Sequence, residues 1–207
     1  MTCPMMLTHL ADGLFDVSGQ PEIEITGLCV DSRQLQQGDA FIAIQGLSAH
    51  GLAYLTSAQA ALASVVLYDT PVPETIPVPE NAIAVPGLQQ LQASIADRFF
   101  DKPSKALRMI GVTGTNGKTS TVQMIAQAMT LQGKIAGTIG TLGVGLYGKL
   151  KAGERTTPDV VAVHRSLAEM RDAGAVAVAM EVSSHALEQG RVARVVFDTA
   201  VFSNLTL

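Results

Sequence analysis

The sequence predicts an α/β protein of two units: an N-terminal α/β domain over residues 1–100, and a parallel-sheet domain over residues 101–207 that carries a phosphate loop. Three observations predict it. Short apolar runs alternate with amphipathic segments, which is typical of a parallel sheet covered on both faces. A polar segment at residues 101–104 separates two such series. A glycine-rich run follows the first apolar run of the second series, where a phosphate loop belongs.

The composition limits location and partners. With 47% apolar residues among 207, the chain has enough material for a packed core. It has no run of the roughly 18–20 apolar residues that a membrane-spanning helix needs and no basic segment at its start, so we expect no membrane partner and a cytoplasmic location. Two cysteines are too few for a disulfide framework, which favours a reducing compartment. A net charge of −4, dispersed basic residues and the absence of Trp argue against a nucleic-acid partner.

In the first unit, residues 40–44 and 64–68 are short apolar runs, and we expect buried strands there. An alanine-rich stretch over residues 53–63 predicts a helix between them. After a proline-rich loop, apolar side chains recur at helical spacing, at Leu88, Leu91, Ile95 and Phe99. This stripe predicts the helix that closes the unit.

Strands and helices are expected to alternate through the second unit. The strands are expected over residues 107–112, 134–139, 176–181 and 195–202, and the helices over 118–131 and 159–172. The first helix has one apolar stripe, formed by Val122, Ile125, Ala126 and Met129. Gly133 follows it as a C-cap glycine. For the second helix we expect Thr157 as N-cap, Pro158 at the first helical position and Gly174 at the end.

The run Gly111-Val-Thr-Gly-Thr-Asn-Gly-Lys-Thr-Ser120 lies between an expected strand and an expected helix. In that setting the glycines let backbone N–H groups point at phosphate oxygens, and the helix presents its positive end to the same anion. Lys118 would reach the terminal phosphates, and the Thr119 hydroxyl would ligate Mg²⁺. The pattern is a variant, because Val112 stands where the strict motif has glycine. The alternative is a glycine-rich turn with an incidental lysine, but the strand-loop-helix context favours nucleotide binding.

Two further features lie downstream of this loop. Gly143-Val-Gly145-Leu-Tyr-Gly148 satisfies a dinucleotide-binding pattern, but no helical stripe follows it, so we expect a loop or hairpin instead. Glu181 ends an expected strand, at the sheet edge where ligands bind in open α/β folds. That position favours a metal ligand, the alternative being a solvated carboxylate.

The run Gly114-Thr-Asn-Gly-Lys-Thr119, taken with Met180-Glu-Val-Ser-Ser-His185, resembles the Mur ligase family. Glu181-Val-Ser-Ser-His-Ala-Leu-Glu-Gln-Gly-Arg191, preceded by Thr156-Thr157-Pro158, looks like the branch that adds the third residue to UDP-N-acetylmuramoyl-L-Ala-D-Glu. The turn Asp31-Ser-Arg33, with Gly38-Asp39 after it, resembles the uridine-nucleotide domain of that branch. The resemblance extends from about residue 25 to the end.

The resemblance implies a set of site residues. Lys118 and Glu181 would be catalytic, and Thr119 and Glu181 would bind Mg²⁺. The ATP site would consist of Gly114, Thr115, Asn116, Gly117, Lys118, Thr119 and Ser120. The UDP end of the precursor would contact Val30, Ser32, Leu47, Ser48 and Ala49. The muramoyl-dipeptide would contact Thr156, Thr157, Ser183, Gln189 and Arg191. The sequence departs from some relatives at two places, with Arg155 where they have Asn and Leu47 where they have His.

The resemblance also implies an activity, the ATP-dependent addition of meso-diaminopimelate or L-lysine to the UDP-muramoyl-dipeptide through an acyl phosphate, by a monomer. Two alternatives stay open: a folylpolyglutamate-type or other phosphate-loop amide ligase, and a non-catalytic module that binds ATP and a UDP-sugar. The sequence stops without a closing helix, so we expect a fragment that lacks the later domains of the family and is inactive alone. From the residues themselves, Asp31 and Arg33 are as consistent with a surface ion pair as with a nucleotide contact, and His185 is left out of the catalytic set.

Overall fold

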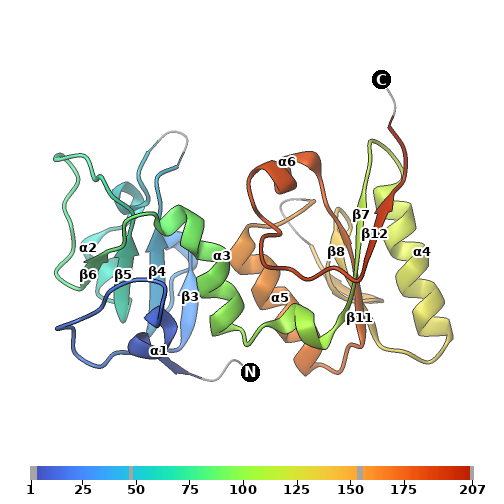
Figure 1. The fold of residues 1–207 in the computed structure, drawn as a ribbon, viewed down its shortest axis with the longest axis horizontal. Helices are drawn as coiled ribbons and strands as arrows, with labels where there is room; N and C mark the ends of the chain where they lie inside the picture. Colours follow the sequence, from blue (N-terminus) through green and yellow to red (C-terminus); the bar gives the residue numbers. More distant parts are fainter. Residues whose placement is uncertain (1–3, 47–48, 153–155, 206–207) are drawn as a thin grey trace. The chain divides into compact units, whose positions relative to one another are not determined.

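The structure is a computed structural model that describes residues 4–46, 49–152 and 156–205. The chain divides into two compact units, one running through Phe99 and the other beginning at Phe100 (Figure 1). Both are α/β units with parallel strands, so the predicted fold class is confirmed. Among the described residues, no helix combines the length and the apolar character needed to cross a membrane.

The first unit is organised around a four-stranded parallel sheet in the order β3-β4-β5-β6. Its strands are β3 (Gly27–Cys29), β4 (Asp39–Ala43), β5 (Val65–Tyr68) and β6 (Ala82–Ala84). A short antiparallel pair, β1 (Met5–Met6) and β2 (Glu24–Ile25), accompanies it. Its helical elements are α1 (Leu7–Ala11), η1 (Ser32–Gln34), η2 (Gly51–Tyr54), α2 (Ser57–Ala60) and α3 (Leu88–Phe99). The two strands and the closing helix predicted here are confirmed within a residue or two.

Two buried polar residues join the strands of this unit to its helices. The Asp69 carboxylate, after β5, accepts hydrogen bonds from the backbone N–H groups of Gly87 (3.0 Å) and Gln89 (3.1 Å) at the start of α3. His50 Nδ1 accepts from the N–H of Leu52 at 3.2 Å, so Nε2 carries the proton that is donated to the carbonyl of Asp69 at 3.0 Å. Buried polar groups are stable only when paired, and both of these are.

The helix predicted over residues 53–63 forms, but it is much shorter than predicted. The chain forms a 3-10 turn at η2 and then a single helical turn, α2. A complete capping box starts α2, because the Thr56 hydroxyl accepts from the Gln59 N–H while the Gln59 side chain accepts from the Thr56 N–H. The Asn81 side chain donates to the carbonyls of Ala60 and Ala63, both at 3.0 Å, which ends the helix there. These tertiary contacts override the helix propensity of the alanines.

The second unit has a six-stranded sheet in the order β10-β9-β8-β11-β7-β12. Four strands are parallel: β7 (Arg108–Thr113), β8 (Ala136–Gly140), β11 (Ala177–Glu181) and β12 (Thr199–Phe202). An antiparallel hairpin, β9 (Gly143–Leu146) and β10 (Lys149–Lys151), extends the edge. The helices are α4 (Lys118–Leu131), α5 (Val160–Asp172), α6 (Ser184–Glu188) and the 3-10 turn η3 (Pro103–Ala106). The hairpin is the feature predicted for the 143–148 glycines.

Helices α4 and α5 cover opposite faces of this sheet (Figure 1). Side chains alternate between faces along a strand, and the two core clusters follow that alternation. The α5 side holds Met109, Val163, Leu167, Val178 and Met180 among its buried members. The α4 side holds Ile110, Val112, Val122, Ala177 and Ala179, with Ile125 and Met129 partly buried against them. Glu181 follows Ala177 and Ala179 at two-residue spacing and therefore falls on the α4 side.

Two predicted boundaries in this unit are wrong. Asp159, not Thr157, is the N-cap of α5, because its carboxylate accepts from the N–H of Ala162 at 2.9 Å. Thr157 lies outside the helix, with its hydroxyl donating to the backbone carbonyl of Glu181 at 2.9 Å. The last strand begins at Thr199 rather than at residue 195. Before it, the Asp198 carboxylate accepts from the N–H of Met109 at 2.7 Å. A side chain therefore takes the place of the backbone carbonyl that strand pairing would supply there.

Replacing Asp159 tests the corrected helix start. We expect Asp159→Ala to lower the free energy of unfolding by about 1 kcal/mol, because it removes the acceptor for an N–H of the first turn of α5. Asp159→Asn keeps a capping oxygen and should stay close to the parent chain. Urea unfolding followed by circular dichroism measures both variants. Equal stability of Asp159→Ala and the parent chain would contradict the assignment.

Candidate functional site

The glycine-rich run forms a tight loop between β7 and α4. Strand β7 ends at Thr113, and α4 begins at Lys118 with Gly117 as its N-cap. Gly114 has φ +130° and Gly117 has φ +81°, values that favour glycine. Gly111 lies within β7, where an added Cβ would meet the ring of Phe197 at 2.9 Å, so its role is close packing rather than phosphate contact. The loop that can receive an anion therefore begins at Gly114.

The Lys118 ammonium lies over this loop. Its Nζ donates to the carbonyl of Gly114 at 2.7 Å and to that of Thr115 at 3.0 Å. An ammonium group has three donors, so these two bonds leave one for an incoming oxygen. The first N–H groups of α4 have no acceptor within the helix and carry the positive end of its dipole. The loop, the ammonium and the helix end thus form one electropositive cradle.

Glu181 places a carboxylate at the end of this cradle. Its residue is 1% exposed, at the carboxyl end of β11, the strand next to β7. Its Oε2 accepts from the Thr119 hydroxyl at 3.0 Å, and its Oε1 accepts from the N–H of Thr141 at 2.8 Å. A Cβ added to Gly140 would collide with the same carboxylate, which explains the glycine at the end of β8. The predicted pair Thr119 and Glu181 is therefore in direct contact.

Thr141 is a site residue that the sequence analysis missed. Its hydroxyl lies 3.3 Å from Glu181 Oε2 and 3.2 Å from the hydroxyl of Thr156. One hydroxyl proton can serve only one of these bonds, and the carboxylate can only accept. When Thr141 donates to Glu181, Thr156 donates to Thr141. This chain of hydroxyls connects the carboxylate to the next group of predicted residues.

The residues predicted to contact the muramoyl-dipeptide form one connected cluster. The Thr157 hydroxyl donates to the backbone carbonyl of Glu181, and its own carbonyl accepts from Arg191 at 2.9 Å. The Arg191 guanidinium also donates to Gln189 Oε1, at 2.6 and 2.9 Å. Ser183 caps α6, because its hydroxyl accepts from the N–H of Ala186 at 3.1 Å. Arg155 lies outside the described residues. His185 is exposed on α6.

Ser203 and Asn204 were also missed as site residues. They follow β12, which pairs with β7 on the side away from β11. The Ser203 hydroxyl donates to the carbonyl of Asn116 at 2.6 Å, and the Asn204 carbonyl accepts from the N–H of Thr115 at 3.0 Å. The sequence showed both residues, but it did not show that β12 lies beside β7. The phosphate loop is therefore contacted from both neighbouring strands.

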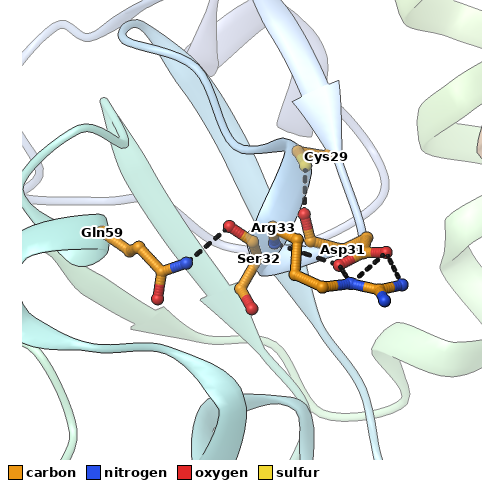
Figure 2. A network of polar contacts seen from close by, with 5 residues as sticks. All are labelled: Cys29, Asp31, Ser32, Arg33 and Gln59. Atoms are coloured by element: carbon orange, nitrogen blue, oxygen red, sulfur yellow. Dashed lines mark hydrogen bonds and ion pairs between the residues drawn. The ribbon is translucent and has the colours of Figure 1, made fainter.

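In the first unit, the described residues predicted for the UDP end follow two adjacent strands. Val30 and Ser32 come after β3, and Ala49 comes after β4, so all three lie beyond the carboxyl ends of paired parallel strands. Leu47 and Ser48 lie outside the described residues. The Ser32 carbonyl accepts from the Gln59 side chain at 2.7 Å, as Figure 2 shows, while among the described residues its hydroxyl makes no hydrogen bond.

Asp31 and Arg33 form a two-pronged ion pair beside Ser32 (Figure 2). Arg33 Nε is 2.9 Å from Asp31 Oδ1, and its terminal nitrogen is 2.6 Å from Oδ2. Asp31 Oδ1 also accepts from the N–H of Arg33, which starts η1. Hydrogen bonding from the Arg33 side chain lowers the pKa of the Asp31 carboxyl below its usual value. The pair thereby fixes the turn that presents Ser32.

Comparison with known proteins places both units. Residues 112–207 match the family model described as Mur ligase middle domain, and residues 24–100 match the one described as Mur ligase family, catalytic domain. A protein of Xanthomonas campestris pv. campestris (strain 8004), named UDP-N-acetylmuramoyl-L-alanyl-D-glutamate--2,6-diaminopimelate ligase, is 56% identical over 206 residues. That alignment covers 100% of this chain and 41% of the relative. A Pseudomonas aeruginosa protein of the same name is 49% identical, covering 98% of this chain and 41% of the relative.

Solved structures agree with this placement. The structure titled UDP-N-acetylmuramoyl-L-alanyl-D-glutamate--2,6-diaminopimelate ligase matches with a TM-score of 0.77 and 28% identity, covering 99% of this chain and 41% of that one. The structure titled UDP-N-acetylmuramoylalanyl-D-glutamyl-2,6-diaminopimelate--D-alanyl-D-alanyl ligase, from Acinetobacter baumannii, matches with a TM-score of 0.62 at 20% identity. The match covers 97% of this chain and 42% of that one, a likeness of fold alone. The chain spans about 41% of the length of the relatives that it matches.

The Asp31–Arg33 ion pair should make the stability of the fold depend on pH. We expect Arg33→Gln to raise the pKa of Asp31 toward its usual value, because the guanidinium that favours the charged carboxylate is lost. A carboxyl with a lowered folded pKa stabilises the fold above the unfolded value of about 3.9 and loses that contribution as the pH falls through the folded pKa.

The two chains should therefore differ in stability at neutral pH and converge as the pH falls through the folded pKa of Asp31. A carbon-detected NMR titration measures the Asp31 pKa in both chains. Urea unfolding at neutral pH and at a pH below that pKa measures the difference in stability. An Asp31 pKa that does not respond to Arg33→Gln would show that the ion pair does not form in solution.

Proposed function

The chain belongs to the Mur ligase family, and from that premise we propose that it serves the ATP-dependent addition of 2,6-diaminopimelate to UDP-N-acetylmuramoyl-L-Ala-D-Glu. The observation that carries the proposal is the single hydrogen-bonded network from the phosphate loop through Glu181 and Thr141 to Thr156 and the Thr157 cluster. That network joins a nucleotide cradle to a polar site on one sheet edge. Relatives 49–56% identical are named for this reaction, which supports diaminopimelate over L-lysine as the amino acid.

The reaction has to activate a carboxylate, which is a poor electrophile. ATP would transfer its γ-phosphoryl group to the side-chain carboxylate of D-Glu, releasing ADP and leaving an acyl phosphate. The amine of the amino acid would attack the acyl carbon, lose a proton and displace inorganic phosphate. Lys118 would hold charge on the transferring group, and the N–H groups at the start of α4 would bind the phosphates. Positioning and electrostatics would carry this step, with Thr156, Thr157 and Arg191 holding the muramoyl-dipeptide.

The residues at the loop fit a magnesium ion. Mg²⁺ prefers oxygen ligands and is held in nucleotide sites by one or two carboxylates, a hydroxyl and the phosphates. Glu181 and Thr119 offer such oxygens, 3.0 Å apart. Within the described part of the chain, the buried carboxylate contacts hydroxyl and amide donors rather than a cationic side chain. A bound Mg²⁺ would neutralise charge on the transferring phosphoryl group. We propose Thr119 and Glu181 as its protein ligands.

The UDP moiety is proposed to bind in the first unit. The loops after β3 and β4 lie at adjacent carboxyl strand ends, the usual ligand edge of an open parallel sheet. The uncommitted Ser32 hydroxyl and the fixed turn around it support a polar contact there. We also propose that the protein acts as a monomer in the cytoplasm, and light scattering after gel filtration would test the first of these.

Thr141 tests the magnesium proposal. We expect Thr141→Val to weaken the Mg²⁺-dependent part of ATP binding about threefold to tenfold, because the carboxylate loses a hydroxyl donor and its link to Thr156. Thr141→Ser restores the hydroxyl and should restore affinity. Thr130→Val is the matched control, because it removes a hydroxyl that donates to the Ala126 carbonyl on α4, away from Glu181. Calorimetric titration at several Mg²⁺ concentrations measures these effects, and equal behaviour of the Val and Ser variants would count against Thr141.

Calorimetric titration with Mg-ATP and with the UDP-muramoyl-dipeptide tests the function as a whole. We expect the chain to bind both, Lys118→Ala to weaken only ATP binding by about tenfold or more, and Ser32→Ala to weaken only the precursor. Lys105→Ala and Ser18→Ala are matched controls at exposed positions outside the two sites. A folded chain that binds ATP but not the precursor would favour another phosphate-loop amide ligase, such as a folylpolyglutamate-type enzyme.

A further inference from the structure

We propose that Asn204, supported by Ser203, is a positioning residue that holds the phosphate loop in its ATP-receiving shape. The proposal rests on the proposed function only in taking a nucleoside triphosphate as the ligand. Strand β12 is parallel to β7 with Phe202 opposite Thr113, so the residues after β12 meet the residues after β7. The N–H of Ser203 donates to the carbonyl of Thr113 at 2.9 Å, which extends the strand pairing up to the loop.

Beyond that point Asn204 pairs with the loop as a further strand residue would. Its carbonyl accepts from the N–H of Thr115 at 3.0 Å. Its side-chain Oδ1 accepts from the N–H of Asn116 at 3.1 Å, and its Nδ2 donates to the carbonyl of the same residue at 3.2 Å. The Ser203 hydroxyl donates to that carbonyl as well. The backbone of Asn116 is thus held by both of its polar groups.

This pairing selects asparagine by its chemistry. A peptide N–H can only donate and a peptide carbonyl can only accept, so the partner side chain must carry one acceptor and one donor side by side. A carboxamide does, which also fixes the orientation of the Asn204 amide. An aspartate of the same shape would keep the acceptor, but it would set a second oxygen against the Asn116 carbonyl and bring a negative charge to a phosphate site.

The pairing also decides which loop amides can serve the nucleotide. The N–H groups of Thr115 and Asn116 are directed to Asn204. The N–H groups at the start of α4 have no intrahelical acceptor and remain for phosphate oxygens. Gly114 allows the two segments to approach, because an added Cβ would collide with the Ser203 hydroxyl and lie 2.8 Å from the Asn204 carbonyl. A loop fixed before the ligand arrives loses less conformational entropy on binding.

Calorimetric titration of the 207-residue chain with Mg-ATP tests the proposal. We expect Asn204→Ala and Asn204→Asp each to weaken binding by about tenfold or more. Asn81→Ala is the matched control, because it also removes two asparagine hydrogen bonds to backbone carbonyls, but in the first unit, and should leave ATP affinity unchanged. In Asn204→Ala, which removes the Oδ1 acceptor, hydrogen exchange at the N–H of Asn116 should accelerate while β7 and α4 stay protected.

The titration distinguishes a failure of the proposed function from a failure of the positioning role of Asn204. If the parent chain binds no Mg-ATP, the proposed function loses its nucleotide site and the role of Asn204 falls with it. If the parent chain binds and either Asn204 variant binds as tightly, the positioning role is overturned while the function stands. Should Asn204→Ala fail to fold, Asn204→Asp carries the test alone, since it preserves the shape of the side chain.

Discussion

The contact on which the site depends is the hydrogen bond between the Thr119 hydroxyl and the buried carboxylate of Glu181. A carboxylate removed from water is costly unless donors surround it. Here three donors come from two segments: the Thr119 hydroxyl on α4, and both the N–H and the hydroxyl of Thr141 after β8. The hydrogen bonds to the Glu181 carboxylate therefore connect the start of α4, the end of β11 and the end of β8. The result is a group of oxygen atoms beside the phosphate loop, the kind of ligand that Mg²⁺ prefers.

The strand order explains how a short loop is held so completely. Strand β7, which leads into the phosphate loop, lies between β11 and β12. Because all three strands are parallel, their carboxyl ends meet at one edge, and the neighbours deliver Glu181 on one side of the loop and Ser203 with Asn204 on the other. The loop itself needs only glycines and a lysine. The contacts that hold it come from residues about 60 and 90 positions later in the chain.

The sequence predicted what depends on local pattern, and it failed where distant contacts decide. The fold class, the phosphate loop, helix α4 and the hairpin at Gly143 could be predicted because apolar spacing, glycine placement and capping act over a few residues. Thr157 looked like an N-cap, but a longer-range partner, the Glu181 carbonyl, takes its hydroxyl and leaves the cap to Asp159. The alanine-rich stretch before Ala63 predicts a long helix, but the Asn81 side chain donates to the carbonyls of Ala60 and Ala63 and the helix ends at Ala60.

Thr141 and Asn204 were not predicted for one reason: the order of strands in the sheet differs from their order in the chain. Thr141 and Asn204 are ordinary loop residues in the sequence, and each gains a role only because its strand ends beside another. The contact between the hydroxyls of Thr141 and Thr156 joins residues 15 positions apart, which no linear motif shows. These hydroxyls link the Glu181 carboxylate to Thr156, while the Thr157 hydroxyl donates to the Glu181 backbone carbonyl and the Thr157 carbonyl accepts from Arg191. Glu181 thus contacts both groups of residues, since its carboxylate accepts from Thr119 and Thr141 and its backbone carbonyl accepts from Thr157.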